Sequence, residues 1–172
     1  MPAHQISVAV FVTGGTFDKE YDELSGALFF KKSHVKEMLV LGRSLVSTRV
    51  ETLMMIDSLV MTDTDRELIA KKCRTAKERN IVITHGTDTM ETTARFLAPR
   101  VHNKTIILTG AMVPYKFGSS DGQFNLGSAL AYAQVLNAGV YVVMNGRFFT
   151  WDNVRKNKQT GFFEERKPGT AP

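Results

Sequence analysis

The sequence predicts an α/β fold: a doubly wound, mainly parallel five-stranded sheet with helices on both faces. Five short runs rich in branched apolar residues alternate with stretches of helical patterning, the arrangement typical of a parallel sheet. These runs are continuously apolar, as strands buried on both faces are. The chain has 172 residues, 43% of them hydrophobic, and can therefore form a sizeable core as one domain.

The first third of the chain is expected to form two strands and one helix. The first strand covers residues 6–12, and residues 50–56 form the second. Between them lies a polar loop, residues 14–33, which is long for a compact domain; long ordered loops often act as lids over a site. Ser33, whose hydroxyl can accept a hydrogen bond from a backbone amide, is expected to begin the helix that follows.

The rest of the chain alternates regularly between helices and strands. Thr64 and Glu67 have the spacing of a capping box, which predicts that the next helix begins at Thr64. Cys73 lies on the apolar side of that helix and is interpreted as a small packing residue, not a catalytic thiol. The other expected elements are strands at 81–84, 105–109 and 140–144 and helices at 90–97 and 124–136.

Composition excludes several classes of protein. Charged residues make up 23% of the chain, which is typical of globular domains and not of disordered ones. No apolar run approaches the ~20 residues of a membrane-spanning helix, and residues 1–5 lack the features of a secretory signal. The single cysteine cannot form an internal disulfide, so a reducing, cytoplasmic location is expected.

The net charge of +5 raises the question of a nucleic-acid partner. Residues 146–172 contain six basic and three acidic residues and so supply +3 of that charge. No recognised nucleic-acid-binding module accompanies this basic tail. We therefore expect no nucleic acid and no membrane as partner, with polyanion binding through the tail as a minor alternative.

The sequence lacks the motifs of nucleotide cofactors and metals. The Thr-Gly-Gly-Thr segment at residues 13–16 lacks the third glycine of a dinucleotide-binding fingerprint, and no Gly-Lys-Ser/Thr phosphate loop occurs. His4, His34 and His102 do not have the spacing of metal ligands. His85 is interpreted as a loop-packing residue that donates a hydrogen bond to the backbone. We predict no metal and no cofactor.

Polar, glycine-containing segments follow the predicted strands, where parallel sheets bind their ligands. They lie at residues 13–16, 57–58, 84–89 and 109–112. Two of them share the pattern Thr-x-Gly-Thr, in which glycine lets the backbone approach a ligand and the next threonine presents a hydroxyl. With the adjacent Asp88, these segments predict a small polar cup for a compact substrate that carries its own carboxylate or amide.

Four segments resemble the bacterial-type L-asparaginases, in order and in approximate spacing. They are residues 13–16, 84–91, 109–114 and 120–126. The resemblance covers essentially the whole chain but only the N-terminal domain of a usual two-domain member. It implies a short form without the C-terminal domain, in which residues 1–172 make one catalytic domain.

The resemblance implies hydrolysis of L-asparagine to L-aspartate and ammonia through an acyl-enzyme, without a cofactor. Thr16 matches the nucleophile, and Thr87 and Asp88 match the second threonine and its neighbouring carboxylate. A threonine hydroxyl needs a base, and the oxyanion needs fixed donors such as backbone amides. Asp88 is suited to hold the α-ammonium group of the substrate. The other implied substrate-binding residues are Gly15, Ser58 and Ala111.

The lysine and the tyrosine that the resemblance implies each have an alternative in this sequence. An ungapped count gives Lys156 as the lysine, and a two-residue shift gives Lys158; in an extended stretch both point to the same side. Tyr21 is the candidate for the tyrosine that partners Thr16, but it follows the threonine more closely than in most members. Its alternative role is that of a loop aromatic covering the pocket. Leu59 stands where the family usually has a glutamine.

The implied absence of a C-terminal domain bears on assembly and on activity. We expect a homo-oligomer, a dimer or a tetramer, formed through another surface, for which the aromatic segment 148–151 is a candidate; packing inside the monomer is the alternative. The alternative function is a catalytically weak amino-acid-binding domain that senses asparagine or aspartate. The preference between asparagine and glutamine stays open.

Overall fold

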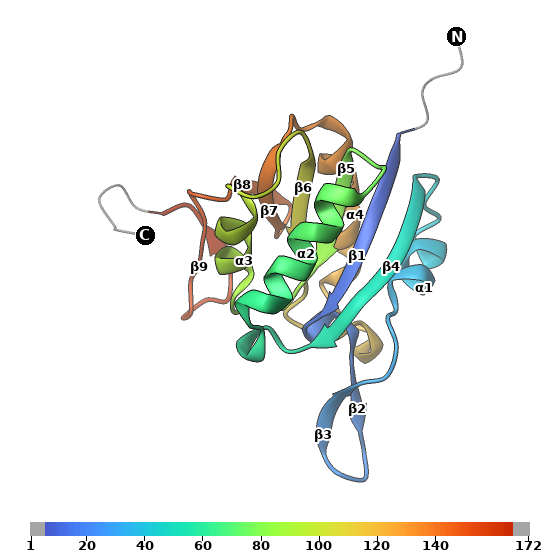
Figure 1. The fold of residues 1–172 in the computed structure, drawn as a ribbon. Coiled ribbons are helices and arrows are strands. Elements are labelled where there is room, and N and C mark those ends of the chain that lie inside the picture. Colours follow the sequence, from blue (N-terminus) through green and yellow to red (C-terminus); the bar gives the residue numbers. More distant parts are fainter. Residues whose placement is uncertain (1–5, 167–172) are drawn as a thin grey trace.

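A six-stranded sheet runs through the centre of the molecule, and helices cover both of its faces (Figure 1). The computed structural model describes residues 6–166, so the N-terminal residues 1–5, with His4, and the last six residues of the basic tail lie outside the described residues. The strand order is β4-β1-β5-β6-β7-β8. The strands are β1 (Ser7–Gly14), β4 (Ser47–Ile56), β5 (Asn80–Thr84), β6 (Thr105–Thr109), β7 (Gly139–Met144) and β8 (Arg147–Thr150).

The predicted fold class is confirmed, with one strand more than expected. The five predicted strands are all present and pair in parallel. The sixth, β8, runs antiparallel to β7 at the edge of the sheet. It follows a two-residue turn in which Asn145 and Gly146 both have positive φ, 56° and 76°. Asn-Gly is the preferred pair for such a turn, so the sequence carried a signal for this hairpin.

Two helices lie on each face of the sheet, and β1 shows how the core is divided between them. Helices α2 (Asp63–Thr75) and α3 (Met90–Leu97) cover one face, and α1 (Val35–Leu41) and α4 (Gly122–Val135) cover the other. Ala9 and Phe11 of β1 point to the first face, and Val8, Val10 and Val12 to the second. This strict alternation, with all five side chains buried, explains why the strand reads as one apolar run.

Helix α2 begins earlier in the chain than predicted. Its capping box uses Thr62 and Asp65, not Thr64 and Glu67: Asp65 N donates to Thr62 Oγ1 at 3.3 Å, and Thr62 N donates to Asp65 Oδ2 at 2.8 Å. Aspartate can thus replace the glutamate of the usual pattern. Cys73 is fully buried in this helix, and burial raises the pKa of its thiol to about 12, which agrees with a packing role.

The long polar loop after β1 is an ordered structure. It contains the 3-10 turn η1 (Thr16–Asp18) and a hairpin of β2 (Lys19–Asp22) and β3 (Ala27–Phe30), which projects from the body of the molecule (Figure 1). Asp22 closes the hairpin turn by accepting hydrogen bonds from Leu24 N and Ser25 Oγ. Ser33 accepts from the amide of Val35, but the N-cap of α1 is His34, so the helix begins one residue later than a cap at Ser33 predicts.

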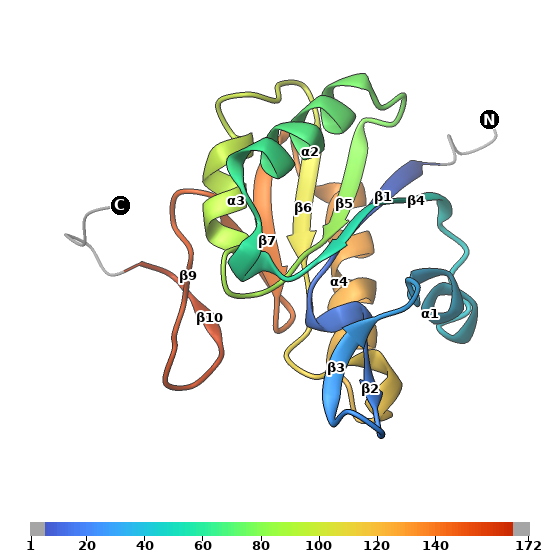
Figure 2. The same cartoon turned by 60° about the horizontal axis from the view of Figure 1, so that its bottom comes forward.

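Three short elements complete the fold. A second hairpin, β9 (Arg155–Lys156) and β10 (Phe163–Glu164), lies beside α3 (Figure 2). The 3-10 turns are η2 (Ser58–Val60), after β4, and η3 (Tyr115–Phe117), after β6. Among the helices of residues 6–166, none has the length and apolar character needed to cross a membrane.

Candidate active site

The two Thr-x-Gly-Thr segments lie side by side at the carboxyl ends of β1 and β5. The strands pair in parallel with Val12 beside Thr84, and Thr13 Oγ1 donates to Thr84 O at 2.7 Å. Gly15 has φ 79°, and a Cβ atom on it would lie 2.4 Å from Gly86 N. Only glycine allows this approach, so the two segments are in direct backbone contact.

Ser58 lies on the other side of Gly86. A Cβ atom on Gly86 would come within 2.4 Å of Ser58 Oγ. The Ser58 side chain is only 2% exposed, and its hydroxyl has no hydrogen-bond partner among the described residues. Its backbone carbonyl accepts from Thr89 Oγ1 at 2.8 Å, which fixes η2 against the β5 loop. A buried hydroxyl without a partner is a group that a ligand can satisfy.

Lys156 joins the second hairpin to the β5 loop. Its Nζ donates to Thr87 Oγ1 at 2.8 Å and to Asp88 Oδ1 at 2.7 Å. The hairpin that carries it is held by a hydrogen bond from Phe163 N to Asn145 Oδ1 at 3.2 Å. Lys158, the other candidate, is exposed at the edge of the same hollow and makes no hydrogen bond within residues 6–166.

A hollow of about 410 Å³ opens beside this lysine. Asp88 and Lys156 both line it, as does the exposed Leu59, whereas Thr16, Ser58 and Thr87 are not among its lining residues. The hollow therefore offers a carboxylate and an ammonium group to a small polar ligand. Its lining residues are Leu59, Asp88, Glu91, Met112, Lys156, Lys158 and Gly161.

The loop after β6, which carries Ala111, is held by Asp121 and Asn125, two residues for which the sequence predicts no role of their own. Asp121 accepts from Met112 N at 3.0 Å, and Asn125 Nδ2 donates to Gly110 O at 2.9 Å. Ala111 itself is fully buried. Asp121 and Asn125 lie in the motif at residues 120–126. The sequence therefore marks this segment as part of the site, but it does not predict that these two residues hold the loop.

His85 is a neutral structural residue beneath the site. Its Nδ1 lies 2.7 Å from Gly86 O, and since a carbonyl only accepts, Nδ1 is the donor. Its Nε2 is 2.8 Å from Thr93 Oγ1, which also accepts from Arg66 Nε. Burial lowers the pKa of His85 to about 4. This is the backbone-donating role that the sequence indicated. Within residues 6–166, no three His, Cys, Asp or Glu side chains are grouped to hold a metal ion.

Thr16 and Tyr21 are not joined in this structure. Thr16 begins η1 directly after Gly15, and its hydroxyl makes no hydrogen bond within the described residues. Tyr21 lies on the projecting hairpin with 56% of its surface exposed. Its hydroxyl is oriented toward the hairpin's own turn, 4.0 Å from where a Cβ atom on Gly26 would lie. In this conformation the Tyr21 hydroxyl is directed to the hairpin turn and makes no hydrogen bond with Thr16.

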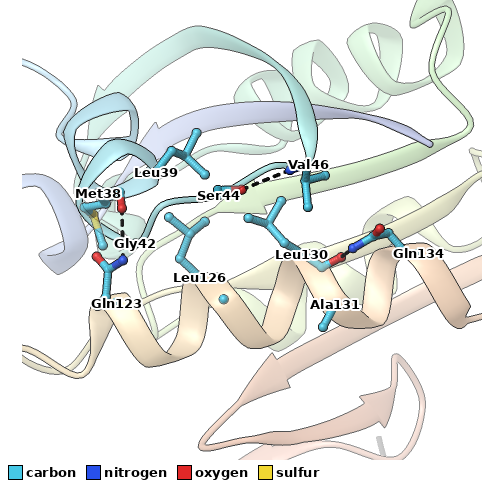
Figure 3. A pocket seen from close by; sticks show the side chains of 11 residues that line it. Met38, Leu39, Gly42, Ser44, Val46, Gln123, Leu126, Leu130, Ala131 and Gln134 are labelled. Carbon is cyan, nitrogen blue, oxygen red and sulfur yellow. Dashed lines mark hydrogen bonds between the residues drawn. The ribbon is translucent and has the colours of Figure 1, made fainter. Parts of the chain in front are cut away.

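A second hollow, of about 240 Å³, lies between α1, the segment that precedes β4, and α4 (Figure 3). Its walls are mainly apolar, and three hydrogen bonds are made there: Gln123 Nε2 donates to Met38 O, Gln134 Nε2 to Leu130 O, and Val46 N to Ser44 Oγ. Gln123 Oε1 is buried without a partner among the described residues. It contains no charged group. This hollow therefore lacks the carboxylate and ammonium groups that line the first hollow.

The aromatic segment 148–151 and the basic tail are partly engaged within the chain. Phe149 is buried in the core, and the Phe148 ring packs 5.2 Å from that of Tyr132, measured between centroids. Phe148 and Trp151 remain partly exposed. In the described part of the tail, three cations form ion pairs: Arg147 with Glu165, Arg155 with Glu164 and Lys156 with Asp88. Ion pairing leaves less free charge for a polyanion.

Comparison with known proteins adds sequence and structural relatives. Residues 7–168 match the family model for the N-terminal domain of asparaginase. The chain is 34% identical over 164 residues to L-asparaginase 2 of Escherichia coli strain K12, which covers 90% of this chain and 47% of that protein. It is 31% identical over 163 residues to the glutaminase-asparaginase of Pseudomonas fluorescens biotype A, covering 87% and 45%.

A solved structure gives the same result. The thermostable L-asparaginase from Thermococcus kodakarensis superposes with a TM-score of 0.79 at 28% identity, over 93% of this chain and 51% of that one. The chain thus spans about half the length of the relatives it matches.

Proposed function

This chain belongs to the asparaginase family, and we propose that it hydrolyses L-asparagine to L-aspartate and ammonia. The observation that carries the proposal is the contact of Lys156 with both Thr87 and Asp88, at 2.8 and 2.7 Å, beside the paired strand ends. A hydroxyl, an amine and a carboxylate in contact are the groups that proton transfer in amide hydrolysis needs.

The substrate is held by three groups of the site. Its α-carboxylate accepts a hydrogen bond from the buried Ser58 hydroxyl, which has no partner within the described residues. Its α-ammonium group pairs with Asp88, whose side chain is half exposed at the hollow. Its side-chain amide donates to the backbone carbonyl of Ala111. Each contact gives a polar group of the substrate a partner in the protein. Together the three contacts hold the side-chain amide of the substrate near Thr16 and Thr87.

The first chemical step is attack by Thr16 on the side-chain carbonyl carbon. A bond forms between Thr16 Oγ1 and that carbon, the carbon–nitrogen bond breaks, and ammonia leaves with the proton of the hydroxyl. Backbone amides beside Gly15 and Thr87 stabilise the negatively charged oxygen. When the β2–β3 hairpin closes over the site, Tyr21 in its phenolate form takes the hydroxyl proton from Thr16 and passes it to the leaving nitrogen.

The second step is hydrolysis of the ester on Thr16. Lys156 in its neutral form takes a proton from the Thr87 hydroxyl, which in turn takes one from the attacking water. Asp88 stabilises the ammonium group that results, because it lies within hydrogen-bond distance of the lysine. Water adds to the ester carbon and the bond to Thr16 Oγ1 breaks. The proton on Lys156 returns through the Thr87 hydroxyl to Thr16 Oγ1, so L-aspartate leaves with Thr16 protonated and Lys156 neutral again.

Release of ammonia from L-asparagine and, separately, from L-glutamine tests the proposal. Thr16→Ala and Thr87→Ala should each lower turnover by about 100-fold or more. Thr64→Ala is the matched control, because Thr64 is exposed on α2 and its hydroxyl makes no hydrogen bond within residues 6–166. Activity that survives in both site variants would overturn the proposal. Tight binding of asparagine without ammonia would favour the amino-acid-sensing alternative.

Trapping of the acyl-enzyme separates the roles of the two threonines. The structure gives a lysine contact to Thr87 and not to Thr16. Rapid acid quenching during turnover, followed by peptide mass analysis, should find one aspartyl group on the peptide that contains Thr16. An aspartyl group on Thr87 would exchange the two roles while leaving the reaction unchanged.

The proposal includes assembly as a homo-oligomer. Phe148 and Trp151 present partly exposed aromatic surface at the edge strand β8, and such surface is enriched in protein interfaces. Analytical ultracentrifugation of the 172-residue chain measures the oligomeric state. A dimer or tetramer that dissociates in Trp151→Lys would support this surface, and a monomer at all concentrations would exclude it.

A further inference from the structure

An ion pair connects the element that carries Thr16 with the segment that carries Ser58. Lys19 follows η1 directly, and Asp57 directly precedes Ser58. Lys19 Nζ lies 2.6 Å from Asp57 Oδ2, and the two side chains are 17% and 36% exposed. The pair is therefore partly shielded from water, where charges interact more strongly than on an open surface.

Both partners are also fixed by other contacts. The second oxygen of Asp57 accepts from Leu59 N at 3.0 Å and so caps η2. Lys19 lies opposite Phe30 in the hairpin, and its Nζ is 5.7 Å from the centroid of that ring. Lys19 also holds the pKa of Asp57 below its usual range, through their hydrogen bond first. The carboxylate thus stays charged with both oxygens engaged.

The position of Thr16 depends on contacts on either side of it. On one side, Gly15 N donates to Ile56 O at 3.0 Å. On the other, Lys19 pairs with Asp57, and Lys19 N closes η1 on Thr16 O. The Thr16 hydroxyl has no hydrogen bond of its own within the described residues. The backbone between the two contacts, which also carries the buried Phe17 and Asp18, therefore decides where this hydroxyl lies.

The hairpin beyond Lys19 projects from the body (Figure 2), so the ion pair lies at its base. Glu20, the next residue, faces the opposite side and pairs with His34 at 3.0 Å. Of these two contacts, only the Lys19 pair reaches the segment that carries Ser58.

We infer that Lys19 and Asp57 are positioning residues that set the separation between Thr16 and Ser58. The inference rests on the proposed function, in which Thr16 contacts the side-chain end of asparagine and Ser58 contacts its α-carboxylate. When the pair is broken, η1 can shift relative to η2, and the carboxylate contact and the attacking hydroxyl no longer fit one substrate. A displacement of about 1 Å at a reacting group can cost about 100-fold in rate.

The kinetic test uses Lys19→Met, Asp57→Asn, the double variant and Lys19→Arg. Asparagine at position 57 can still accept from Leu59 N, so it removes the charge and retains the cap. Each single variant should lower kcat/KM for asparagine by about 10- to 100-fold, and the double variant should lose no more than the worse single one. Lys19→Arg should restore most of the loss.

The matched control is Lys116→Met, which breaks the exposed pair of Lys116 with Glu37, at 3.2 Å, away from the hollow. It should leave kcat/KM unchanged. Losses that add in the double variant, or an equal loss in Lys116→Met, would overturn the inference.

Hydrogen exchange supplies a readout that does not depend on turnover. Amides of residues 15–22 should exchange about 10-fold faster in Lys19→Met and in Asp57→Asn, whereas amides of β5 and β6 should not change. If the wild-type chain releases no ammonia, the proposed function fails and exchange alone judges the ion pair. Unchanged exchange of residues 15–22 in both variants overturns the inference, even when ammonia is released normally.

Discussion

Lys156 Nζ donates a 2.8 Å hydrogen bond to Thr87 Oγ1, although the two residues are 69 positions apart in the chain. The contact joins the hairpin that follows β8 to the loop that follows β5. It brings a cation to a side chain on one of the two Thr-x-Gly-Thr segments. The sequence left two lysines as candidates, and the geometry distinguishes them, because Lys158 makes no such bond within residues 6–166.

The two lysines give the first prediction. Lys156→Met should lower kcat for asparagine hydrolysis by about 100-fold or more, because the Thr87 hydroxyl loses its proton acceptor. Lys158→Met should stay within about 3-fold of the wild type, since that side chain lies only on the rim of the hollow. Steady-state ammonia release measures both. Equal losses in the two variants would contradict the assignment of roles.

Ser58 gives the second prediction, which separates binding from stability. Ser58→Ala should raise KM for asparagine by about 10-fold, because a hydrogen bond to a charged group contributes about 1.5–3 kcal/mol. It should not reduce the free energy of unfolding, since the buried hydroxyl has no partner in the free protein within the described residues. Kinetics and urea unfolding provide the two measurements.

Thr93→Ala is the control for Ser58→Ala, because the buried Thr93 hydroxyl contacts His85 Nε2 at 2.8 Å. Removing it should destabilise the fold by about 1–3 kcal/mol, since His85 Nε2 loses its hydroxyl partner and Arg66 Nε loses its acceptor. If Ser58→Ala destabilises the fold as much as Thr93→Ala does, the Ser58 hydroxyl is not free for a ligand.

Local patterns were sufficient for the central sheet. The strand at 105–109 and the helix at 90–97 have the predicted bounds, because each is a buried segment whose period and flanking residues agree. The contact between the two Thr-x-Gly-Thr segments also follows from local information: parallel neighbouring strands bring their carboxyl ends to one edge. These parts of the site could be predicted because one sheet register determines them.

Other parts depend on contacts between distant segments. Lys156 is directed to Thr87 by a hairpin that Asn145 anchors through Phe163, and no pattern near residue 156 encodes that. The sequence predicts a loop at residues 14–33 where the structure has a hairpin, because strands of only four residues each give too short an alternation to recognise. The orientation of Tyr21 follows from that hairpin and could not be predicted.

His85 gives the third prediction, a pH dependence of stability. The pKa of His85 is lowered by burial from 6.5 to about 4 in the folded protein, so the fold favours the neutral ring. The unfolded chain therefore binds more protons than the folded protein between pH 6.5 and 4. As a result, the free energy of unfolding has its full value above pH 6.5 and decreases as the pH falls through this range. The loss should be about 3 kcal/mol at pH 4.

Urea unfolding between pH 4 and 7 measures this loss against His85→Asn. The amide nitrogen of asparagine can take the place of Nδ1 and donate to Gly86 O, but it does not titrate. The variant should be less stable at pH 7, because Thr93 loses a partner, and its free energy of unfolding should depend less on pH than that of the wild type. Parallel pH profiles in both proteins would contradict the neutral assignment.

Glycine at position 15 gives the last prediction. Gly15→Ala would place a Cβ atom 2.4 Å from Gly86 N at a φ of 79°, so the ends of β1 and β5 must separate or the backbone must become strained. We expect a loss of about 2 kcal/mol or more in the free energy of unfolding and loss of ammonia release. Gly127→Ala is the matched control: its Cβ atom would meet nothing within 4 Å in the middle of α4, and alanine should stabilise that helix by about 0.5–1 kcal/mol. If both variants keep normal activity and stability, the close approach of the two strand ends is not what assembles the site.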